Sequence, residues 1–269
     1  MIPGMSDMVE ARLAALLTPE VTAVAAEADS GAEFFFYTGQ DAESAAIGVE
    51  VTSGPEITLV VTDPARPAGR IRIQTGGNGH LVYIDNRGSN GSLHANIRLA
   101  GGDSAVVFND IGAGYVGLGD VFLRSDGQFL FWGRGATAVA CSVEIEGRGQ
   151  GVVVGDDALI SNGVWIRNHD MHPLHDLATG ARIGRPPVNT VLERHVWLGQ
   201  ESLLLGCERI GMGTVVGARS LVKGRVPPRV AVAGTPARVL REGISWGRDM
   251  TGMTAAERLS IGLPACVDA

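Results

Sequence analysis

Aliphatic residues recur at every sixth position from residue 192 to residue 222. The six positions are Leu192, Leu198, Leu204, Ile210, Val216 and Val222, and the same spacing of six occurs upstream at Val154, Ile160 and Ile166. A period of six fits neither an amphipathic helix, with about 3.6 residues per turn, nor a flat strand, with a period of two. It fits a coil of three short strands joined by tight turns, in which each aliphatic side chain points inward. Because one coil cannot bury its own apolar face, coils must stack, and the pattern predicts a parallel β-helix rather than an ordinary β-sandwich.

Between residues 33 and 150 the chain predicts strands without one clear period. Gly accounts for 38 of the 269 residues, about twice its usual share of roughly 7%. Short apolar runs separated by Gly, Asn, Asp and Ser are typical of strands between tight turns. The runs are Phe34–Tyr37, Ile57–Val61, Ile71–Ile73, Leu81–Ile84, Ala105–Phe108, Val121–Leu123 and Phe129–Trp132. The first thirty residues instead place apolar side chains at roughly helical spacing, with Pro19 ending or kinking a segment.

We therefore expect an all-β chain in three segments. Residues 1–70 form an N-terminal helix and β extension, residues 71–240 form the β-helix with a loop over 167–191, and residues 241–269 form a short helical tail. The stretch Pro64–Gly69, which contains two prolines and a glycine, marks the first boundary.

Charge and composition exclude several classes of protein. With 22 basic and 29 acidic residues the formal net charge is −7, which argues against a nucleic-acid binder because such a protein needs a net basic face. A hydrophobic content of 45% excludes a disordered chain. The three cysteines, Cys141, Cys207 and Cys266, lie far apart and support neither a disulfide framework nor a Cys-x-x-Cys metal site. No signal peptide and no run of about 18 apolar residues is found, so we expect a cytoplasmic protein without a membrane span.

The period breaks between Ile166 and Leu192. This gap holds one hexad and about 20 further residues that leave the β-helix and return to it. The extra stretch carries three histidines, His169, His172 and His175. Because function tends to lie on loops that project from a rigid scaffold, this loop is the first place to look for a site.

Residues 130–245 resemble the hexapeptide-repeat acyltransferases, a superfamily of left-handed β-helix enzymes. The resemblance rests on Gly155-Asp156-Asp157, Ile160–Val164, His172–Asp176, His195–Gly199, Ile210-Gly211, Val216-Gly217-Ala218, Val226-Pro227-Pro228 and the ending Val232–Val239. The chain is most similar to the O-acetyltransferases that modify sugars of bacterial surface polysaccharides such as capsule, O-antigen or exopolysaccharide. The resemblance implies a homotrimer with active sites between subunits, and transfer of an acetyl group from acetyl-CoA to a hydroxyl of a carbohydrate acceptor.

A sugar hydroxyl that attacks a thioester carbonyl must lose its proton, and a neutral imidazole with a usual pKa of ~6.5 suits the role of base. The resemblance assigns this role to His172, which precedes Pro173, and His175 is the next candidate. Asp170 or Asp176 is a candidate for orienting the imidazole. Trp197 matches a tryptophan near the cleft, and the backbone amide of Gly199 or Gln200 matches the oxyanion donor.

The resemblance also implies where the acyl donor binds. Gly217, Ala218 and Ser220 match the wall along the pantetheine, and Arg238 and Arg241 match a basic pair that meets the phosphates. Lys223 is a further candidate for a phosphate contact. It stands one place earlier than the family lysine, so Arg225 is an alternative.

The acceptor site departs from the galactoside and maltose subgroup. The Asn and Asp that hold the sugar there correspond most nearly to Cys141 and Gly149, which cannot make those contacts. Glu144, Glu146 and Arg167 lie nearby, and we expect Arg167, Asp170 and His175 to contact a different acceptor.

Three other functions stay open. The first is N-acetylation of an amino sugar or a xenobiotic. The second is a zinc enzyme like the γ-class carbonic anhydrases, in which the three loop histidines bind the metal, although our expectation is an enzyme without a metal. The third is a non-catalytic, carbohydrate-binding β-helix.

Overall fold

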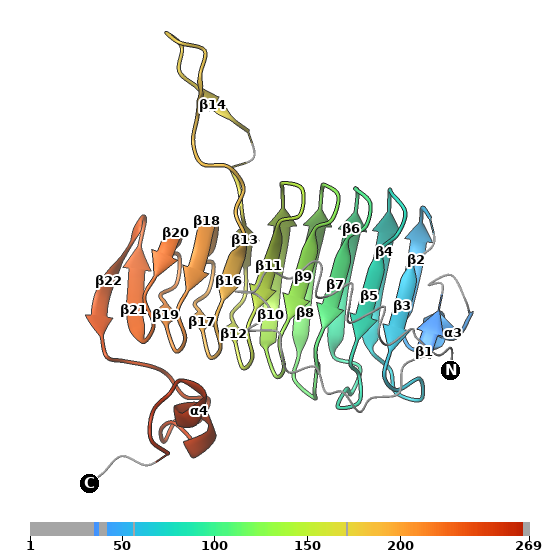
Figure 1. Ribbon diagram of the computed structural model, residues 1–269. Coiled ribbons are helices and arrows are strands. Elements are labelled where there is room, and N and C mark those ends of the chain that lie inside the picture. Colours follow the sequence, from blue (N-terminus) through green and yellow to red (C-terminus); the bar gives the residue numbers. More distant parts are fainter. Residues whose placement is uncertain (1–34, 38–41, 56, 171, 266–269) are drawn as a thin grey trace.

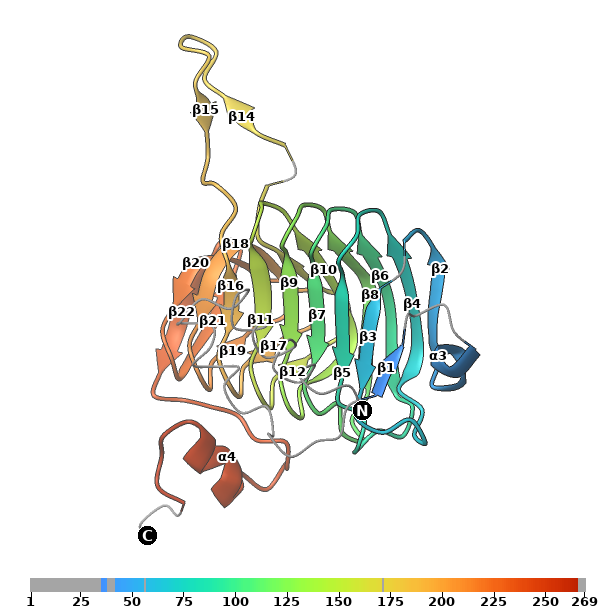
Figure 2. The same cartoon turned by 45° about the vertical axis from the view of Figure 1, so that its right-hand side comes forward.

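The structure, a computed structural model, describes residues 35–37, 42–55, 57–170 and 172–265. It is a column of stacked coils with a thin hairpin arm rising from one corner and a small helix, α4, beside the opposite corner (Figures 1 and 2). The predicted N-terminal helix falls within residues 1–34 and lies outside the described residues. The column is a left-handed parallel β-helix, which confirms the predicted fold class.

The strands stack on three faces of the prism. The first face holds β2 (Val49–Ser53), β4 (Gly69–Thr75), β6 (Leu93–Leu99), β8 (Val116–Leu123), β10 (Thr137–Ile145), β13 (Val164–Arg167), β18 (Leu203–Ile210) and β20 (Leu221–Val226). The second face holds β3 (Thr58–Val61), β5 (Leu81–Ile84), β7 (Ala105–Phe108), β9 (Phe129–Trp132), β11 (Gly151–Val154) and β16 (Thr190–Leu192). The third face holds β12 (Leu159–Ile160), β17 (Trp197–Leu198), β19 (Val215–Val216) and β21 (Val230–Gly234). Three of the long strands cross a corner of the prism: β10 begins on the third face, where it pairs with β12, and the ends of β18 and β20 continue onto the second face, where β18 pairs with β16.

Neighbouring strands on each face pair in parallel, and only the ends of the column depart from this rule in the described chain. At one end β1 (Phe35–Tyr37) pairs antiparallel with β3, and a short helix, α3 (Ala42–Ala46), precedes β2. At the other end β22 (Ala237–Glu242) turns back antiparallel on β21. The chain then leads to α4 (Ala255–Ser260), which confirms the predicted helical tail.

The predicted stacking of hexads is confirmed by the strand register. Leu198 pairs with Val216 and Leu204 pairs with Val222, so one coil in this half takes three hexads. All six aliphatic residues of the repeat are buried, with at most 1% of their surface exposed. Leu204 also pairs with Ile166, although the inserted loop lies between them in the sequence. The stretch from Ile166 to Leu204 is therefore one ordinary coil plus the insertion.

The N-terminal coils are longer than the hexad coils and unequal in length. Val49 pairs with Ile71, and Ile71 pairs with Ala95 after a longer stretch of chain. The next two coils, from Ala95 to Leu118 and from Leu118 to Cys141, are intermediate in length. Because the coil length varies, no fixed period is visible in this half of the sequence, although it forms the same kind of coil.

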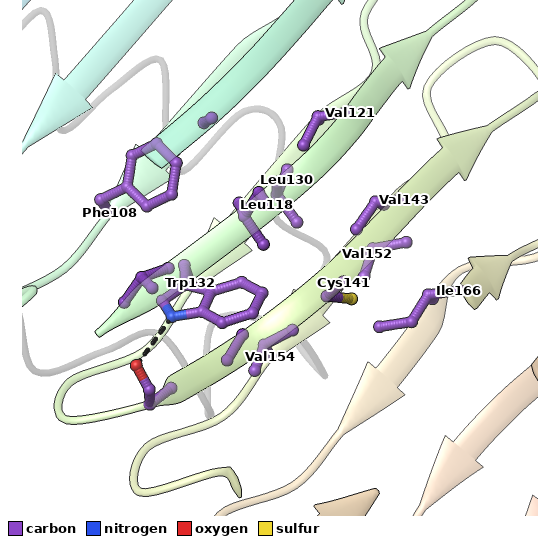
Figure 3. Packing of buried hydrophobic residues seen from close by; sticks show 14 of the residues in the cluster. Phe108, Leu118, Val121, Leu130, Trp132, Cys141, Val143, Val152, Val154 and Ile166 are labelled. Carbon is purple, nitrogen blue, oxygen red and sulfur yellow. Dashed lines mark hydrogen bonds between the residues drawn. The ribbon is translucent and has the colours of Figure 1, made fainter. Parts of the chain in front are cut away.

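The core runs along the inside of the prism. Inward-pointing side chains from successive coils stack on one another, as Figure 3 shows for Phe108, Leu118, Leu130 and Val154. Trp132 is the largest fully buried side chain, and its indole N–H donates to the Ala136 carbonyl at 3.0 Å. A buried ring of this size contributes strongly to stability only when its N–H has a partner, as it has here.

The second face is apolar on its outer side too. The residues that alternate with the inward set form a second buried cluster: Val60, Leu81, Tyr83, Ala105, Val107, Phe129, Phe131, Val153 and Val191. This explains why the strands on this face read as continuous apolar runs, since residues on both sides of each strand are buried.

The inserted residues form the arm. It leaves the first face after β13, makes a small antiparallel hairpin of β14 (Leu174–His175) and β15 (Arg182–Ile183), and returns to the second face at β16. The boundaries predicted at residues 70 and 240 stay predictions. The sheet crosses the first of them, because β2 and β3 pair in register with β4 and β5. In the described part of the chain no helix is long and apolar enough to cross a bilayer.

Candidate active site

The arm carries the predicted base, His172, as an exposed side chain two residues before β14. The turn of the arm is built by Asp176, which accepts hydrogen bonds from the amides of Ala178 and Thr179, at 3.0 and 2.7 Å, and from the Thr179 hydroxyl at 2.8 Å. The bonds from Thr179 hold the pKa of Asp176 below its ordinary value. Asp176 therefore shapes the arm in this chain, which leaves Asp170 as the candidate for orienting His172.

The other two loop histidines differ in surroundings. His175 is exposed, with Nδ1 3.4 Å from the Gly180 carbonyl oxygen. His169 is buried at the root of the arm, where Nδ1 lies 2.9 Å from the Asp170 carbonyl oxygen and Nε2 has no hydrogen-bond partner among the described residues. The three rings are not grouped as metal ligands anywhere in the described structure.

A cavity of about 320 Å³ opens at the root of the arm, where β13 ends beside the middle parts of β18 and β20. Lys223 and Asp170, both predicted to be site residues, face each other across it with Nζ and Oδ1 4.0 Å apart. Beside them Arg185 and Arg225 share one carboxylate, that of Glu208, at 3.3 and 2.9 Å. Three cations therefore meet two carboxylates, so this corner carries a local positive charge in an acidic protein.

The acceptor candidate Arg167 lies in an ion cluster on the outer side of the first face. Its Nε is 3.0 Å from Oε2 of the buried Glu144, whose Oε1 accepts from Nε of Arg124 at 2.8 Å. Each guanidinium also covers a ring: Arg124 lies 4.2 Å from the centre of the Phe122 ring, and Arg167 lies 4.4 Å from the centre of the Trp165 ring. Two arginines around one carboxylate leave a net positive charge beside the root of the arm.

The predicted cleft residues lie on another face. Trp197 is on β17, about a third exposed, and its Nε1 donates to Ser161 Oγ at 3.2 Å. The Gly199 amide already donates to the Val216 carbonyl at 2.8 Å, as part of the bonding between coils. The Gln200 amide carries no hydrogen bond within the described chain, so Gln200 is the better candidate for an oxyanion donor.

One chain does not bring these groups together. The arm rises away from the coils at one corner, whereas β17 lies on the face next to α4 (Figures 1 and 2). His172 therefore stands apart from Trp197, Gly199 and Gln200 within a single described chain.

The residues predicted to hold the acyl donor lie on the last coils. Ala218 is at a turn, while Ser220 is buried and its Oγ accepts the Gly234 amide at 3.1 Å. The Gly217 amide donates to the Val232 carbonyl at 2.8 Å, and a Cβ on Gly217 would lie only 2.8 Å from that of Ala233. The tight packing of this wall thus requires glycine.

The two predicted phosphate ligands are available for an anion. Arg238 and Arg241 lie exposed on β22 at the end of the column. Neither makes an ion pair with any residue that the structure describes, and Arg238 donates only to the Ala237 carbonyl beside it. Their free guanidinium groups fit the phosphate end of a nucleotide-bearing donor.

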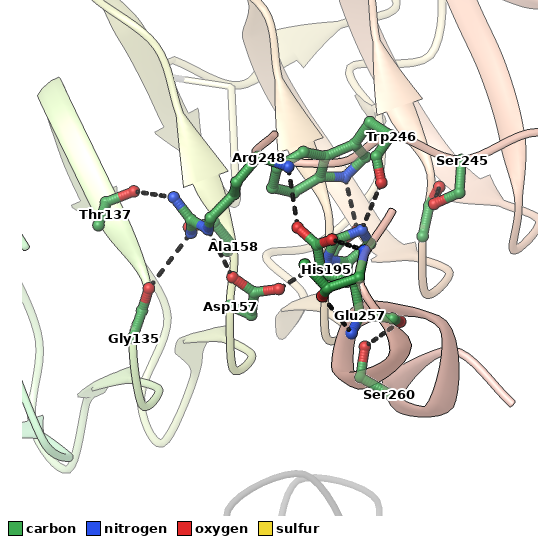
Figure 4. Close-up of polar contacts among 12 residues, drawn as sticks. Gly135, Thr137, Asp157, Ala158, His195, Ser245, Trp246, Arg248, Glu257 and Ser260 are labelled. Carbon is green, nitrogen blue, oxygen red and sulfur yellow. Dashed lines mark hydrogen bonds and ion pairs between the residues drawn. The ribbon is translucent and has the colours of Figure 1, made fainter. Parts of the chain in front are cut away.

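Beside β17 the C-terminal segment is fixed by a polar cluster that the sequence did not predict (Figure 4). We call it the clasp: Asp157, His195, Trp246, Arg248 and Glu257. The His195 ring is fully buried and stacks on the Trp246 indole at 4.1 Å. Its Nδ1 lies 2.6 Å from Asp157 Oδ2 and its Nε2 2.8 Å from the Trp246 carbonyl oxygen. The carboxylate of Asp157 and the carbonyl oxygen of Trp246 are both acceptors, so the His195 ring joins the coils to the C-terminal segment.

Arg248 and Glu257 complete the clasp. Arg248 donates from Nε to Asp157 Oδ1 at 2.7 Å, and its backbone amide donates to Glu257 Oε1 at 2.8 Å. Burial alone would raise the pKa of Asp157, but the hydrogen bonds from His195 and Arg248 outweigh it and lower the pKa. Glu257, which also caps α4 through Thr254, has its pKa lowered against burial in the same way. The clasp also fixes Trp246 with its ring centre 6.1 Å from that of Trp197.

The stacked hexads, the inserted arm and the basic last coils define a β-helix of the hexapeptide-repeat class. No family model matches the chain. The polysialic acid O-acetyltransferase of Neisseria meningitidis is 33% identical over 176 residues, which cover 65% of this chain and 78% of that protein. The polysialic acid O-acetyltransferase of Escherichia coli O1:K1 / APEC is 29% identical over 130 residues, 48% of this chain and 41% of that protein.

A solved structure agrees in fold. The crystal structure of the polySia specific acetyltransferase NeuO matches with a TM-score of 0.55 at 24% identity, over 70% of this chain and 77% of that chain. The chain belongs to the hexapeptide-repeat O-acetyltransferases, and it is an acyltransferase. This confirms the family that the hexads and the ending Val232–Val239 indicated.

Proposed function

We propose that the protein transfers an acetyl group from acetyl-CoA to a hydroxyl of a sugar in a bacterial surface polysaccharide, with His172 as the base. The observation that carries the proposal is the arm itself, an insertion in a member of this family that presents an exposed imidazole outside the coils. The two relatives described above are named as acetyltransferases of polysialic acid, a polymer of sugars, which supports a carbohydrate acceptor. An alcohol acceptor is favoured over an amine because both are O-acetyltransferases.

The reaction needs a proton acceptor at the attacking oxygen. The neutral imidazole of His172 takes the proton of the sugar hydroxyl as that oxygen attacks the thioester carbonyl, and the carbonyl oxygen becomes negative. We assign the hydrogen bond to this oxyanion to the free amide of Gln200. Collapse of the tetrahedral intermediate breaks the C–S bond, and the departing sulfur takes the proton from the imidazolium, so the base is restored.

The donor supplies the acetyl group, and its phosphates give it an anionic end that basic side chains can bind. We place its phosphates against Arg238 and Arg241, with Lys223 or Arg225 nearby, and its pantetheine along the wall at Gly217 and Ala218. The donor and the free thiols of Cys141 and Cys207 fit a cytoplasmic location.

Because one chain keeps His172 apart from Gln200, the proposed site is shared between subunits. We propose a homotrimer in which the arm of one subunit reaches the third face of its neighbour, beside Trp197. This arrangement gives the exposed apolar residues of the arm, Leu174, Leu177 and Ile183, a surface to pack against.

The first test replaces His172 with Ala and measures thiol release from acetyl-CoA with a polysaccharide acceptor. We expect turnover to fall about 10²- to 10⁴-fold, as loss of a general base does, while acetyl-CoA affinity stays nearly unchanged. His175→Ala, the same change on the neighbouring exposed histidine of the arm, is the matched comparison. Since His175 is proposed only to contact the acceptor, its loss should act mainly on the KM for the polysaccharide. Full activity of the His172 variant would remove this residue from the mechanism.

The second test examines the shared site. Trimers of the His172→Ala variant and of a Trp197→Ala variant are each expected to be impaired. When the two are dissociated and reassembled together, random mixing restores about a quarter of the intact sites if each site takes one residue from each of two subunits. No recovery on mixing would contradict a site between subunits.

A further inference from the structure

The N-terminal coils carry a polar groove on the outer side of the first face. Two adjoining cavities, of about 570 and 380 Å³, lie over β2, β4, β6 and β8, which run side by side in Figure 1. Both cavities are lined by Glu50, Arg72 and Asn96, so they form one continuous groove. This part of the chain holds none of the residues proposed for acetyl transfer, and the fold does not explain why its outer side is hollowed.

The groove is built from rows of side chains that cross the strands. One row runs through Glu50, Arg72, Asn96 and Asp120, and a second through Gln74, Arg98, Phe122, Glu144 and Arg167. Exposed and buried residues alternate along β4 and β6, so the row members point outward. Since neighbouring strands lie about 4.8 Å apart, the second row spans roughly 20 Å along the prism. It ends at Arg167, close in sequence to Asp170 at the root of the arm.

Arginine dominates the charge of this face. Arg70, Arg72 and Arg98 line the groove against Glu50 and Asp120. The ion pairs are long, 3.6 Å from Arg72 to Glu50 and 3.8 Å from Arg98 to Asp120, and the two arginine side chains are 72% and 55% exposed. Loose, exposed pairs of this kind contribute little to stability, so a ligand carboxylate can replace the protein carboxylate at little cost. Farther along, Arg124 and Arg167 share the single carboxylate of Glu144.

Aromatic rings lie beside the arginines. Phe122, a member of the second row, and Trp165, two residues before Arg167 on β13, support the guanidinium groups of Arg124 and Arg167, and Trp165 is 37% exposed. Next to the groove, Tyr115 is 47% exposed and meets the His94 ring edge to face at 5.4 Å. Guanidinium groups held on rings are fixed in direction, and their planar forks match carboxylates. Flat apolar rings beside polar side chains suit the faces and edges of sugar units.

We propose that this face binds an extended acidic polysaccharide, which lies across the strands along the prism with its carboxylates on the arginine rows and leads to the arm. The inference rests on the proposed function, because it makes the groove the place where the polymeric acceptor is held during transfer. The ligand class follows from the charge: a chain of net charge −7 concentrates arginines on one hollowed face, which favours a polymer with regularly spaced carboxylates over a neutral one.

The test measures polymer binding without acetyl-CoA, so that it does not depend on the transfer reaction. The variant is Arg72→Ala with Arg98→Ala. The matched control is Arg66→Ala with Arg148→Ala, which removes the same charge from two exposed arginines outside the groove. The probes are polysialic acid and polygalacturonate, which carry one carboxylate per sugar, and neutral dextran. Binding is followed by affinity electrophoresis at low and at physiological ionic strength.

We expect the intact protein to bind the acidic polymers and not dextran, with binding weakened by salt. The groove variant should bind them about tenfold more weakly, as the loss of two charge-assisted contacts implies, while the control variant binds as the intact protein does. The His172→Ala protein should bind normally, which separates failure of the groove from failure of the proposed chemistry. Equal binding of the groove and control variants would overturn the proposal. So would equal binding of dextran, no binding of either acidic polymer, or a change in subunit number in the groove variant, which would make this face a contact between subunits.

Discussion

The clasp makes a quantitative prediction about Asp157→Asn. This change keeps the shape of the side chain but removes the charge that faces both the His195 ring and the Arg248 guanidinium, at 2.6 and 2.7 Å. Hydrogen bonds to charged groups contribute about 1.5–3 kcal/mol. Asp157 is 31% exposed, so solvent screens part of the interaction, and we expect a loss of about 2 kcal/mol.

The loss of stability should be confined to the C-terminal segment. In a solenoid each coil contacts only its neighbours, so weakening a segment at the end opens that segment without unfolding the column. About 2 kcal/mol corresponds to a roughly 30-fold larger opening constant. The assay is hydrogen exchange at the amides of Arg248 and Thr254, which donate to the two oxygens of Glu257. Their exchange should speed up about 30-fold, while exchange in the hexad strands stays unchanged.

Glu201→Gln is the matched control. Glu201 forms an ion pair with Arg219 at 2.7 Å, but both side chains are well exposed, so the same chemical change should cost at most about 1 kcal/mol. A second variant, His195→Asn, removes the imidazole and introduces a residue that tolerates the left-handed backbone found there, with φ of 57°. If Asp157→Asn leaves the exchange of both amides unaltered, or if the two changes add without coupling, the contact between Asp157 and His195 does not hold the C-terminal segment.

Two further predictions concern the column and its response to acid. Leu204→Ala should lower the free energy of unfolding by about 2–5 kcal/mol, because it leaves a cavity at a fully buried position stacked between Ile166 and Val222. The control is Leu203→Ala, at a half-buried neighbouring position, which should cost much less. Chemical denaturation measures both. Because Asp157 has its pKa lowered in the folded state, its stabilisation of the clasp is complete above its unfolded pKa of about 3.9 and is lost as the pH falls further. Limited proteolysis of the C-terminal segment should therefore speed up below about pH 4, and resistance there would contradict the assignment.

The sequence predicted the fold where one physical rule acted alone. Inward positions of a three-sided coil must be apolar, and from residue 192 to residue 222 every coil has three hexads, so the rule is visible as a period. In the N-terminal half the same rule acts on longer coils of unequal length, and the period is blurred. The apolar runs still marked the second-face strands, such as Leu81–Ile84, which are buried on both sides. The strands β2 and β6 were missed, because outward polar residues interrupt them at every second position.

The site was predictable only in part. The break in the repeat located the arm and His172, because an insertion in a periodic sequence is visible without a structure. The clasp was not predictable, since His195 and Trp246 are far apart in the chain and neither stands in a motif that indicates the contact. The groove could not be predicted from the sequence for a similar reason. Arg72 and Arg98 reach one face only because of the length of the coil between them, which the sequence does not reveal.

The unequal length of the coils has a consequence for how such a chain can be lengthened or shortened. Each coil forms hydrogen bonds only with the coils above and below it. Removal of the whole coil between Leu118 and Cys141 would therefore let equivalent positions of the remaining coils pair again. The N-terminal half is thus a module that can gain or lose whole coils. Its size can change in evolution, or by design, without disturbing the hexads that carry the arm.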